Sequence, residues 1–172
     1  MRQLILGGAR SGKSRLAEER AKQLARPVIY IATAKVCDQE MANRVQLHQQ
    51  SRPDNWELIE EPVALPQCLR RLSGDNKVVL VDCLTLWLTN LLLIDQDAML
   101  QGMDELERAV AAFQGDLFLV SNEVGWGIVP MGELSRVFQD NTGHLHQKLA
   151  AIVESVTLCV AGIPLDIKGG VK

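Results

Sequence analysis

Short apolar runs alternate with amphipathic stretches along the whole 172-residue chain. Four of the runs have the length of a strand and are almost entirely apolar, which is typical of strands buried in a parallel sheet. They cover residues 3–6, 28–31, 78–81 and 117–120, and shorter strand-like segments cover residues 56–60, 156–160 and 163–167.

Segments between the apolar runs have the periodicity of helices, with apolar residues three and four positions apart. We expect helices over residues 14–25, 38–50, 64–72 and 84–94, a further one through residues 99–113, and a last one through residues 145–152. Strands and helices therefore alternate, and no sequence repeat interrupts them. This order predicts an α/β fold, a single domain over residues 1–172, with a mostly parallel sheet and helices on both faces.

The first apolar run ends in the stretch Gly7-Gly8-Ala9-Arg10-Ser11-Gly12-Lys13-Ser14, which fits the pattern G-x-x-x-x-G-K-[ST]. Between a strand and a helix, such a loop points its backbone N–H groups at a polyphosphate, and the helix dipole favours the same anion. We expect Lys13 to approach the β- and γ-phosphates and Ser14 to give a hydroxyl ligand to Mg²⁺. The alternative is a glycine-rich turn that binds nothing, and the pattern leaves open whether Arg10 faces phosphate or solvent.

The third apolar run ends in Asp82, as in a Walker B strand that delivers a carboxylate beside the phosphate loop. Ligands of such folds bind at the carboxyl ends of the strands. We therefore expect Asp82, the segment 32–34 and the loop 122–127, which all follow strands, to lie near the phosphate loop. Asp82 and Ser14 are the predicted metal ligands, and the alternative for Asp82 is a cap on the helix that follows.

His48 lies on the predicted helix 38–50, where it shares one face with Met41 and Val45. This pattern alone favours a histidine packed partly on the core. Arg44 and Arg52 would nevertheless give an incoming phosphate cationic neighbours, and an imidazole with its ordinary pKa of about 6.5 is a competent nucleophile near neutral pH. His144 and His146 do not share a helix face, and we expect both to be solvated.

Composition limits the classes of partner. The formal net charge of -3 gives no global positive field for polymeric nucleic acid, so an anion must be held by a local site. The four cysteines form no C-x-x-C pair, which argues against a zinc site or a disulfide framework. The longest apolar stretch is too short to span a bilayer, and the first strand leaves no room for a targeting segment, so we expect a cytoplasmic protein.

Several blocks together resemble the bifunctional adenosylcobinamide kinase/adenosylcobinamide-phosphate guanylyltransferase family of cobalamin biosynthesis. The blocks, in order, are residues 7–15, Tyr30-Ile31-Ala32-Thr33, Glu40-Met41-Ala42 with Arg44 and His48, Arg52-Pro53 with Trp56, Asp82-Cys83-Leu84-Thr85, and Asn122-Glu123-Val124-Gly125 with Gly127-Ile128-Val129-Pro130. They cover nearly the whole chain. The phosphate loop is generic, whereas the block around His48 and the Asn-Glu-Val-Gly block are specific to this family.

The resemblance implies two reactions and a P-loop NTPase fold. ATP or GTP phosphorylates the aminopropanol hydroxyl of adenosylcobinamide, and GMP is then transferred from GTP through a GMP-histidine intermediate to give adenosylcobinamide-GDP. His48 stands at the position of that histidine, so the resemblance favours the nucleophile over the packed histidine. The nucleotide-binding residues implied outside the phosphate loop are Ala32, Thr33, Ala34, Gln49, Gln50, Ser51, Arg52, Glu60 and Asp82.

The resemblance also implies a corrinoid substrate and a homo-oligomer such as a trimer. The charge and the apolar stretches already predict no nucleic-acid partner and no membrane span. The chain departs from the family at Leu47, where some members carry another histidine, and at His144 and His146, which replace an arginine and an asparagine.

Two alternatives remain at this stage. One is a P-loop small-molecule kinase without guanylyl transfer, and the other is a GTP-binding regulatory module. The latter needs a guanine-reading N-K-x-D motif, but Val78-Val79 follows Asn76-Lys77.

Overall fold

The computed structural model describes residues 1–35, 53 and 55–169. Its strands are β1 (Arg2–Gly7), β2 (Val28–Ala32), β3 (Glu57–Glu60), β4 (Val78–Asp82), β5 (Asp116–Asn122), β6 (Ser155–Val160) and β7 (Ile163–Lys168). Its helices are α1 (Lys13–Gln23), α3 (Leu65–Leu72), α4 (Leu84–Leu92), α5 (Gln96–Ala112) and α6 (Glu133–Ile152). The predicted helix 38–50 lies outside the described residues.

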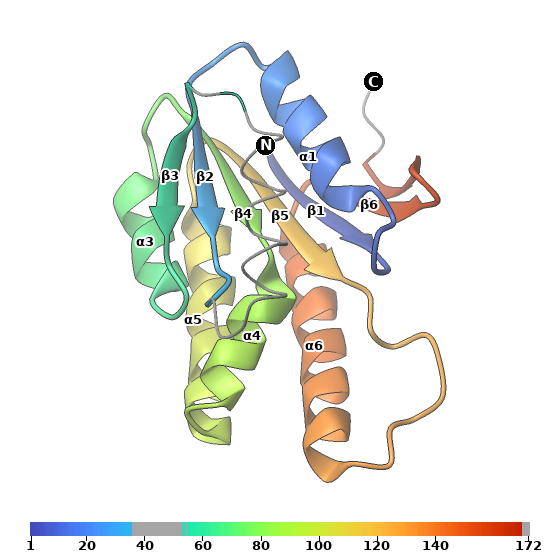
Figure 1. The fold of residues 1–172 in the computed structure, drawn as a ribbon. Coiled ribbons are helices and arrows are strands. Elements are labelled where there is room, and N and C mark those ends of the chain that lie inside the picture. The colour runs from blue at the N-terminus through green and yellow to red at the C-terminus, as the bar shows by residue number, and fades with distance from the viewer. Residues whose placement is uncertain (36–52, 54, 170–172) are drawn as a thin grey trace.

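All seven strands form one sheet in the order β3-β2-β4-β5-β1-β6-β7. Every neighbouring pair is parallel except β6 and β7, which are antiparallel (Figure 1). β1 lies between β5 and β6, with Gly7 in register with Asn122 and Cys159. The predicted α/β fold with a mostly parallel sheet is therefore confirmed.

Helices cover both faces of the sheet, but unequally (Figure 1). Side chains alternate along each strand, so Leu4 and Leu6 face one core while Ile5 faces the other. The larger core lies against α3, α4, α5 and α6 and includes the fully buried Trp87. The smaller core lies under α1, which contributes Ala17 and Ala21.

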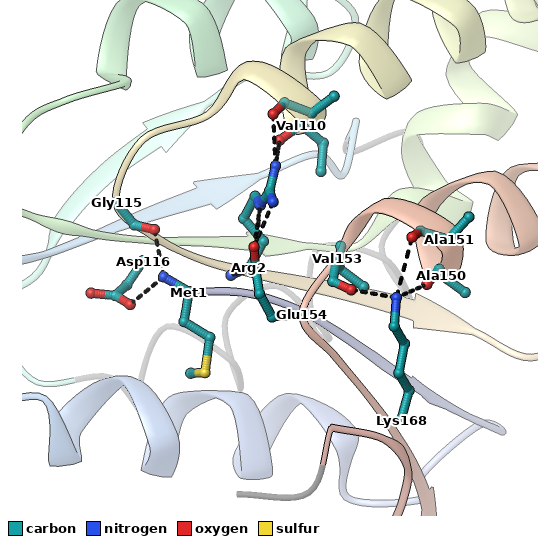
Figure 2. A network of polar contacts seen from close by, with 11 residues as sticks. Met1, Arg2, Val110, Gly115, Asp116, Ala150, Ala151, Val153, Glu154 and Lys168 are labelled. Carbon is teal, nitrogen blue, oxygen red and sulfur yellow. Dashed lines mark hydrogen bonds and ion pairs between the residues drawn. The ribbon is translucent and has the colours of Figure 1, made fainter.

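Charged side chains join the elements where the strands begin (Figure 2). The Arg2 guanidinium forms an ion pair with Glu154, with 2.5 Å between Nη2 and Oε1. Arg2 Nη1 also donates to the carbonyl oxygens of Val110 (3.0 Å) and Ala111 (2.7 Å), which end α5. Carbonyls in the last turn of a helix have no partner within the helix, so Arg2 both caps α5 and joins it to the sheet.

Lys168 plays the same part for α6 (Figure 2). Its ammonium group donates to the carbonyl oxygens of Ala150 (2.7 Å), Ala151 (3.2 Å) and Val153 (2.7 Å). A cation is favoured at this end of the helix dipole, so the contact ties the last strand to the end of α6.

Three further predictions can be compared with the described residues. β5 extends to Asn122, two residues beyond the predicted strand, and α6 begins at Glu133, well before the periodic stretch that we had identified. Of the helices in the described part of the chain, none is long and apolar enough to cross a membrane.

Candidate active site

The phosphate loop joins the end of β1 to the start of α1, as predicted. Arg10 and Gly12 have positive φ angles of 55° and 91°. The N–H of Ser11 donates to the carbonyl of Gly8 (3.3 Å), and α1 then begins at Lys13. The loop therefore turns sharply before the helix, which directs backbone N–H groups towards its inner side.

The turn between β6 and β7 packs directly beneath this loop. A Cβ atom on Gly12 would lie 3.1 Å from the Cα of Gly162. The carbonyl of Ser11 accepts the N–H of Gly162 (2.8 Å) and the thiol of Cys159 (3.0 Å). The backbone of the phosphate loop is therefore in direct contact with the backbone of the β6–β7 turn. Glycine is required at position 12 both for its φ angle and for this close approach.

Lys13 is the charged residue at the centre of the loop, and its side chain is only 8% exposed. Its ammonium group donates to the carbonyl oxygen of Gly8 (3.1 Å). Within the described ranges, no carboxylate lies at ion-pair distance from it. A nearly buried lysine is rarely left without an anion, so its surroundings suit a negatively charged ligand.

Asp82 ends β4 at the same edge of the sheet. Its carboxylate oxygen Oδ2 accepts a hydrogen bond from the hydroxyl of Tyr30 on β2 (2.9 Å). Tyr30 is 3% exposed, so its ring is fixed by the core beneath α1. The tyrosine therefore sets the orientation of the Asp82 carboxylate.

A buried threonine supports the next peptide, Asp82–Cys83, which is cis. The hydroxyl of Thr33 donates to the carbonyl of Cys83 (2.7 Å) and accepts the N–H of Cys83 (2.9 Å). The Asn90 amide on α4 donates to the carbonyl of Thr33 (2.8 Å). β2, β4 and α4 are thus joined by side chains just behind Asp82.

The Cys83 thiol connects this corner electrostatically to the phosphate loop. Burial, together with the charge of the Asp82 carboxylate, raises the pKa of Cys83 to about 11, and the Lys13 ammonium acts in the opposite direction. The opposing effect of Lys13 means that its charge is felt at the Asp82–Cys83 corner. β5 pairs with both β1 and β4, with Gly7 in register with Asn122 and Asp82 in register with Val120, so the two predicted parts of the site lie at the same edge of the sheet.

The loop after β5 begins at the same edge of the sheet. The N–H of Glu123 donates to the carbonyl of Gly7 (3.0 Å), and the Asn122 amide donates to the hydroxyl of Thr85 on α4 (3.0 Å). These contacts hold the start of the Asn-Glu-Val-Gly block between the phosphate loop and α4.

His146 on α6 corrects one prediction, because it is buried rather than solvated. Its Nε2 lies 2.8 Å from Ser121 Oγ, and its Nδ1 lies 3.9 Å from a carboxylate oxygen of Glu123. Burial lowers the pKa of His146, and the charge of Glu123 acts in the opposite direction. His144 is exposed, as predicted. The spacing of Thr142, Leu145, His146 and Leu149 would have indicated that position 146 faces inwards.

The remaining predicted nucleotide contacts divide into two groups. At the ends of β2 and β3, Thr33 is buried, its neighbours Ala32 and Ala34 are half-buried, and Glu60 is exposed. The others, His48, Gln49, Gln50, Ser51 and Arg52, lie outside the described residues.

Sequence reasoning had assigned no role to Tyr30 or Asn90, although a tyrosine within an apolar strand signals a hydroxyl that needs a partner.

Residues 3–167 match the protein family described as cobinamide kinase / cobinamide phosphate guanyltransferase. The chain belongs to this family. It therefore has cobinamide kinase and cobinamide-phosphate guanylyltransferase activity in cobalamin biosynthesis, and its substrates include nucleotides and a cobinamide.

Relatives match over almost the full length of both chains. The bifunctional adenosylcobalamin biosynthesis protein CobP of Pseudomonas aeruginosa is 52% identical over 170 residues, which cover 98% of this chain and 98% of the relative. The bifunctional adenosylcobalamin biosynthesis protein CobU of Escherichia coli is 41% identical over 179 residues, covering 96% of this chain and 98% of the relative.

A solved structure of a protein from Pyrococcus horikoshii has the same fold. It superposes with a TM-score of 0.58 at 11% identity, covering 97% of this chain and 85% of that one. At this identity the likeness concerns the fold alone.

Proposed function

We propose that the phosphate loop, Lys13 and Asp82 form one nucleotide site that serves both reactions of this enzyme. The observation that carries the proposal is the nearly buried Lys13, on a loop that the strand order places at the same edge of the sheet as Asp82. The loop amides and Lys13 would hold the triphosphate. Ala32, Thr33, Ala34 and Glu60 end the neighbouring strands and would contact the nucleotide from that side.

Mg²⁺ fits the oxygen donors at this edge. Ser14 lies in the first turn of α1 beside the loop, and Asp82 retains acceptor capacity beyond the hydrogen bond that Tyr30 donates. Among the described residues no group of three or more His, Cys, Asp and Glu side chains could hold a metal ion by itself. Such a cage is not needed, since Mg²⁺ usually takes one or two carboxylates together with substrate phosphates and water. When bound, the ion would neutralise charge that develops on the phosphates.

In the kinase step, the acceptor is the aminopropanol hydroxyl of cobinamide. Its oxygen bonds to the γ-phosphorus of ATP or GTP as the bond to the bridging oxygen breaks, the hydroxyl proton is lost to water, and a nucleoside diphosphate leaves. This chain contributes positioning and charge stabilisation. Lys13 and the loop amides would hold the transferred phosphoryl group, and the hydrogen bond from Tyr30 would keep the Asp82 carboxylate in a fixed orientation.

In the guanylyl step, His48 is the proposed nucleophile. An imidazole nitrogen would bond to the α-phosphorus of GTP while the bond to the bridging oxygen of the β-phosphate breaks, releasing pyrophosphate. A phosphate oxygen of cobinamide phosphate would then displace the imidazole and form the diphosphate linkage. The residues Gln49, Gln50, Ser51 and Arg52, which follow His48, would contact the nucleotide. The loop amides and Lys13 would stabilise the leaving pyrophosphate.

A homo-oligomer, such as a trimer, and a cytoplasmic location belong to the same proposal. The edge strand β7 supports assembly, because Ile163, Leu165 and Ile167 are 59–70% exposed on it. An exposed apolar strand at a sheet edge is a common contact between subunits.

Labelled GTP tests the covalent step. With GTP labelled at the α-phosphate, the wild-type protein should form an acid-labile adduct, because a phosphorus–nitrogen bond to imidazole is cleaved in acid. His48→Asn should form no adduct but keep the kinase reaction, whereas the exposed-site control His144→Asn should be labelled like the wild type. Equal labelling of His48→Asn would contradict the role of His48, and a loss of both activities in that variant would indicate a binding or structural role.

A further inference from the structure

A cavity of about 340 Å³ opens between α4, the first half of α6 and the loop that joins β5 to α6. That loop extends away from the sheet before it returns to the start of α6 (Figure 1). The walls of the cavity are mainly apolar, with Leu92 and Leu93 from α4, Val124 from the loop, and Leu134 and Phe138 from α6. The reactions described above give this cavity no role.

The polar groups of the cavity are neutral. They belong to Thr89, Ser135 and Gln139, and no charged side chain lines the cavity in the part of the chain that the structure describes. The Gln139 amide donates to the carbonyl of Val124 (3.0 Å) and so holds the loop wall against α6. A mainly apolar concavity with a few neutral polar groups is typical of a site for a small molecule.

The cavity is continuous with the nucleotide edge. Thr89 donates to the carbonyl of Thr85 (2.9 Å), and the Thr85 hydroxyl accepts the amide of Asn122 (3.0 Å). Asn122 is in register with Gly7, the first residue of the phosphate loop. Val124, which lines the cavity, therefore lies only two residues beyond the strand end that pairs with the phosphate-loop strand. A molecule in the cavity would have one end beside the phosphates.

The same loop exposes large apolar side chains next to the cavity. Trp126, Ile128, Val129 and Met131 are 66–98% exposed. Contiguous exposed apolar groups usually mark a surface that binds something. Together with the cavity they would offer a largely apolar surface that is wider than the cavity itself, with the Arg136 guanidinium bound to the carbonyls of Pro130 (3.1 Å) and Met131 (2.5 Å).

We propose that this cavity seats one edge of the corrin macrocycle of cobinamide, with the apolar loop residues against the remainder of the ring. A corrinoid joins apolar ring faces to a rim of uncharged amides, which matches the apolar walls and the neutral Thr89, Ser135 and Gln139. The aminopropanol arm then extends along Asn122 to the phosphate loop. This docking rests on the proposed nucleotide site, because it brings the aminopropanol hydroxyl to the phosphate loop from the side of Asn122.

Filling the cavity tests the docking. Ser135 is exposed and lines the cavity, so Ser135→Phe should fold normally and occupy the space that the ring edge needs. Equilibrium dialysis of cobinamide, followed by its visible absorption, should show affinity weakened by about tenfold or more, while GTP affinity stays within about twofold. Leu93→Asp, which places a charge on the neutral wall at another exposed position, should weaken cobinamide binding in the same way.

Asp140→Phe is the matched control, because Asp140 is exposed on the same helix and lies outside the cavity. Unchanged cobinamide affinity in Ser135→Phe, or equal loss in Asp140→Phe, would overturn the docking. Light scattering supplies a second criterion: a change in assembly mass in Ser135→Phe would show that the surface is a contact between copies of the chain. Wild-type protein that bound GTP but no cobinamide would contradict the proposed function itself, whereas the other contrary outcomes concern only the docking.

Discussion

The two ends of the same strands are built from different interactions. At the edge where the parallel strands begin and the antiparallel β7 ends, Arg2 and Lys168 place their charges on helix carbonyls and, for Arg2, on a carboxylate. Where the strands end, Lys13 is nearly buried without a carboxylate partner among the described residues, and Asp82 is held by one neutral hydroxyl. Charge is therefore compensated within the protein at one end and left for a ligand at the other.

This difference predicts a separation of effects. Substitutions at the beginning of the strands should lower the free energy of unfolding and leave the chemistry intact, because their partners are structural. Substitutions at the carboxyl ends of the strands should lower activity, because the side chains there interact with groups of the substrate. Stability and activity measured on the same variants test the separation.

Lys13→Ala should have the largest effect. Removal of a charge that stabilises the transferred phosphates should lower kcat/KM of both reactions by about 10²–10³-fold or more, with little change in Tm. Lys22→Ala, at an exposed position of the same helix, is the control and should keep both activities. A large fall in Tm for Lys13→Ala would mean that this end of the sheet also depends on internal charge compensation.

Arg2→Met should have the converse effect. The substitution removes the guanidinium from the carbonyls of Val110 and Ala111 and from Glu154, which should cost about 1–3 kcal/mol of unfolding free energy. The N–H of Phe113 still donates to the Val110 carbonyl, and the backbone N–H at position 2 still donates to Glu154. Urea denaturation measures the loss, and both activities of the folded protein should stay within about twofold. Arg108→Met, at an exposed position of α5, is the control. An activity loss that exceeds the unfolded fraction would contradict the separation.

Tyr30→Phe should lower both stability and kinase activity moderately, because it removes the buried hydrogen bond that Tyr30 donates to Asp82. We expect a stability loss of about 1 kcal/mol and a fall of about tenfold in kinase kcat, since the carboxylate loses its fixed orientation. Thr142→Val removes a buried hydroxyl that donates to the Phe138 carbonyl (2.7 Å) and should reduce stability without the kinetic loss. Equal kinetic losses in the two variants would show that Tyr30 has no specific role towards Asp82.

The pH dependence of the Arg2 ion pair should be the smallest effect. The Arg2 guanidinium lowers the pKa of Glu154 to about 2. The folded-state pKa lies below the unfolded value of about 4.3, so the contribution to stability is complete above that value and is lost as pH falls towards 2. Because the Glu154 side chain is 48% exposed, solvent screening limits the contribution to at most about 1 kcal/mol.

Denaturation of wild type and Glu154→Gln at several pH values measures this contribution. The difference in unfolding free energy should be constant above about pH 5 and should vanish towards pH 2. Glu19→Gln, which affects an exposed pair with Arg15, is the control. A difference that grows as the solution becomes more acidic would contradict the assigned sign.

Sequence reasoning predicted the parts of the site that depend on backbone and missed those that depend on distant side chains. The phosphate loop was found because its glycines are required by local geometry, and Gly12 indeed has a φ of 91° and touches Gly162. Tyr30 and Asn90 were missed because their value depends on the neighbours that the sheet order gives them. β2 pairs with β4, so a tyrosine at position 30 meets an aspartate at position 82, and no local spacing encodes that meeting.

The error at His146 has a related cause. Two histidines separated by one residue cannot share a helix face, which is correct, but the inference that both are solvated does not follow from it. One of them had to share the face of Leu145 and Leu149, and the structure shows that it is His146.

The position of β1 has a consequence for the order in which the protein becomes functional. β1 is made first, yet both of its neighbours, β5 and β6, come from the last third of the chain, and Gly162 supports the phosphate loop from below. While the protein is being synthesised, the nucleotide-binding motif therefore exists long before anything holds it in shape. Released chains that end before Gly162 should therefore not be retained on immobilised GTP, whereas the full chain should be retained. The first motif to leave the ribosome would then be among the last to acquire its function.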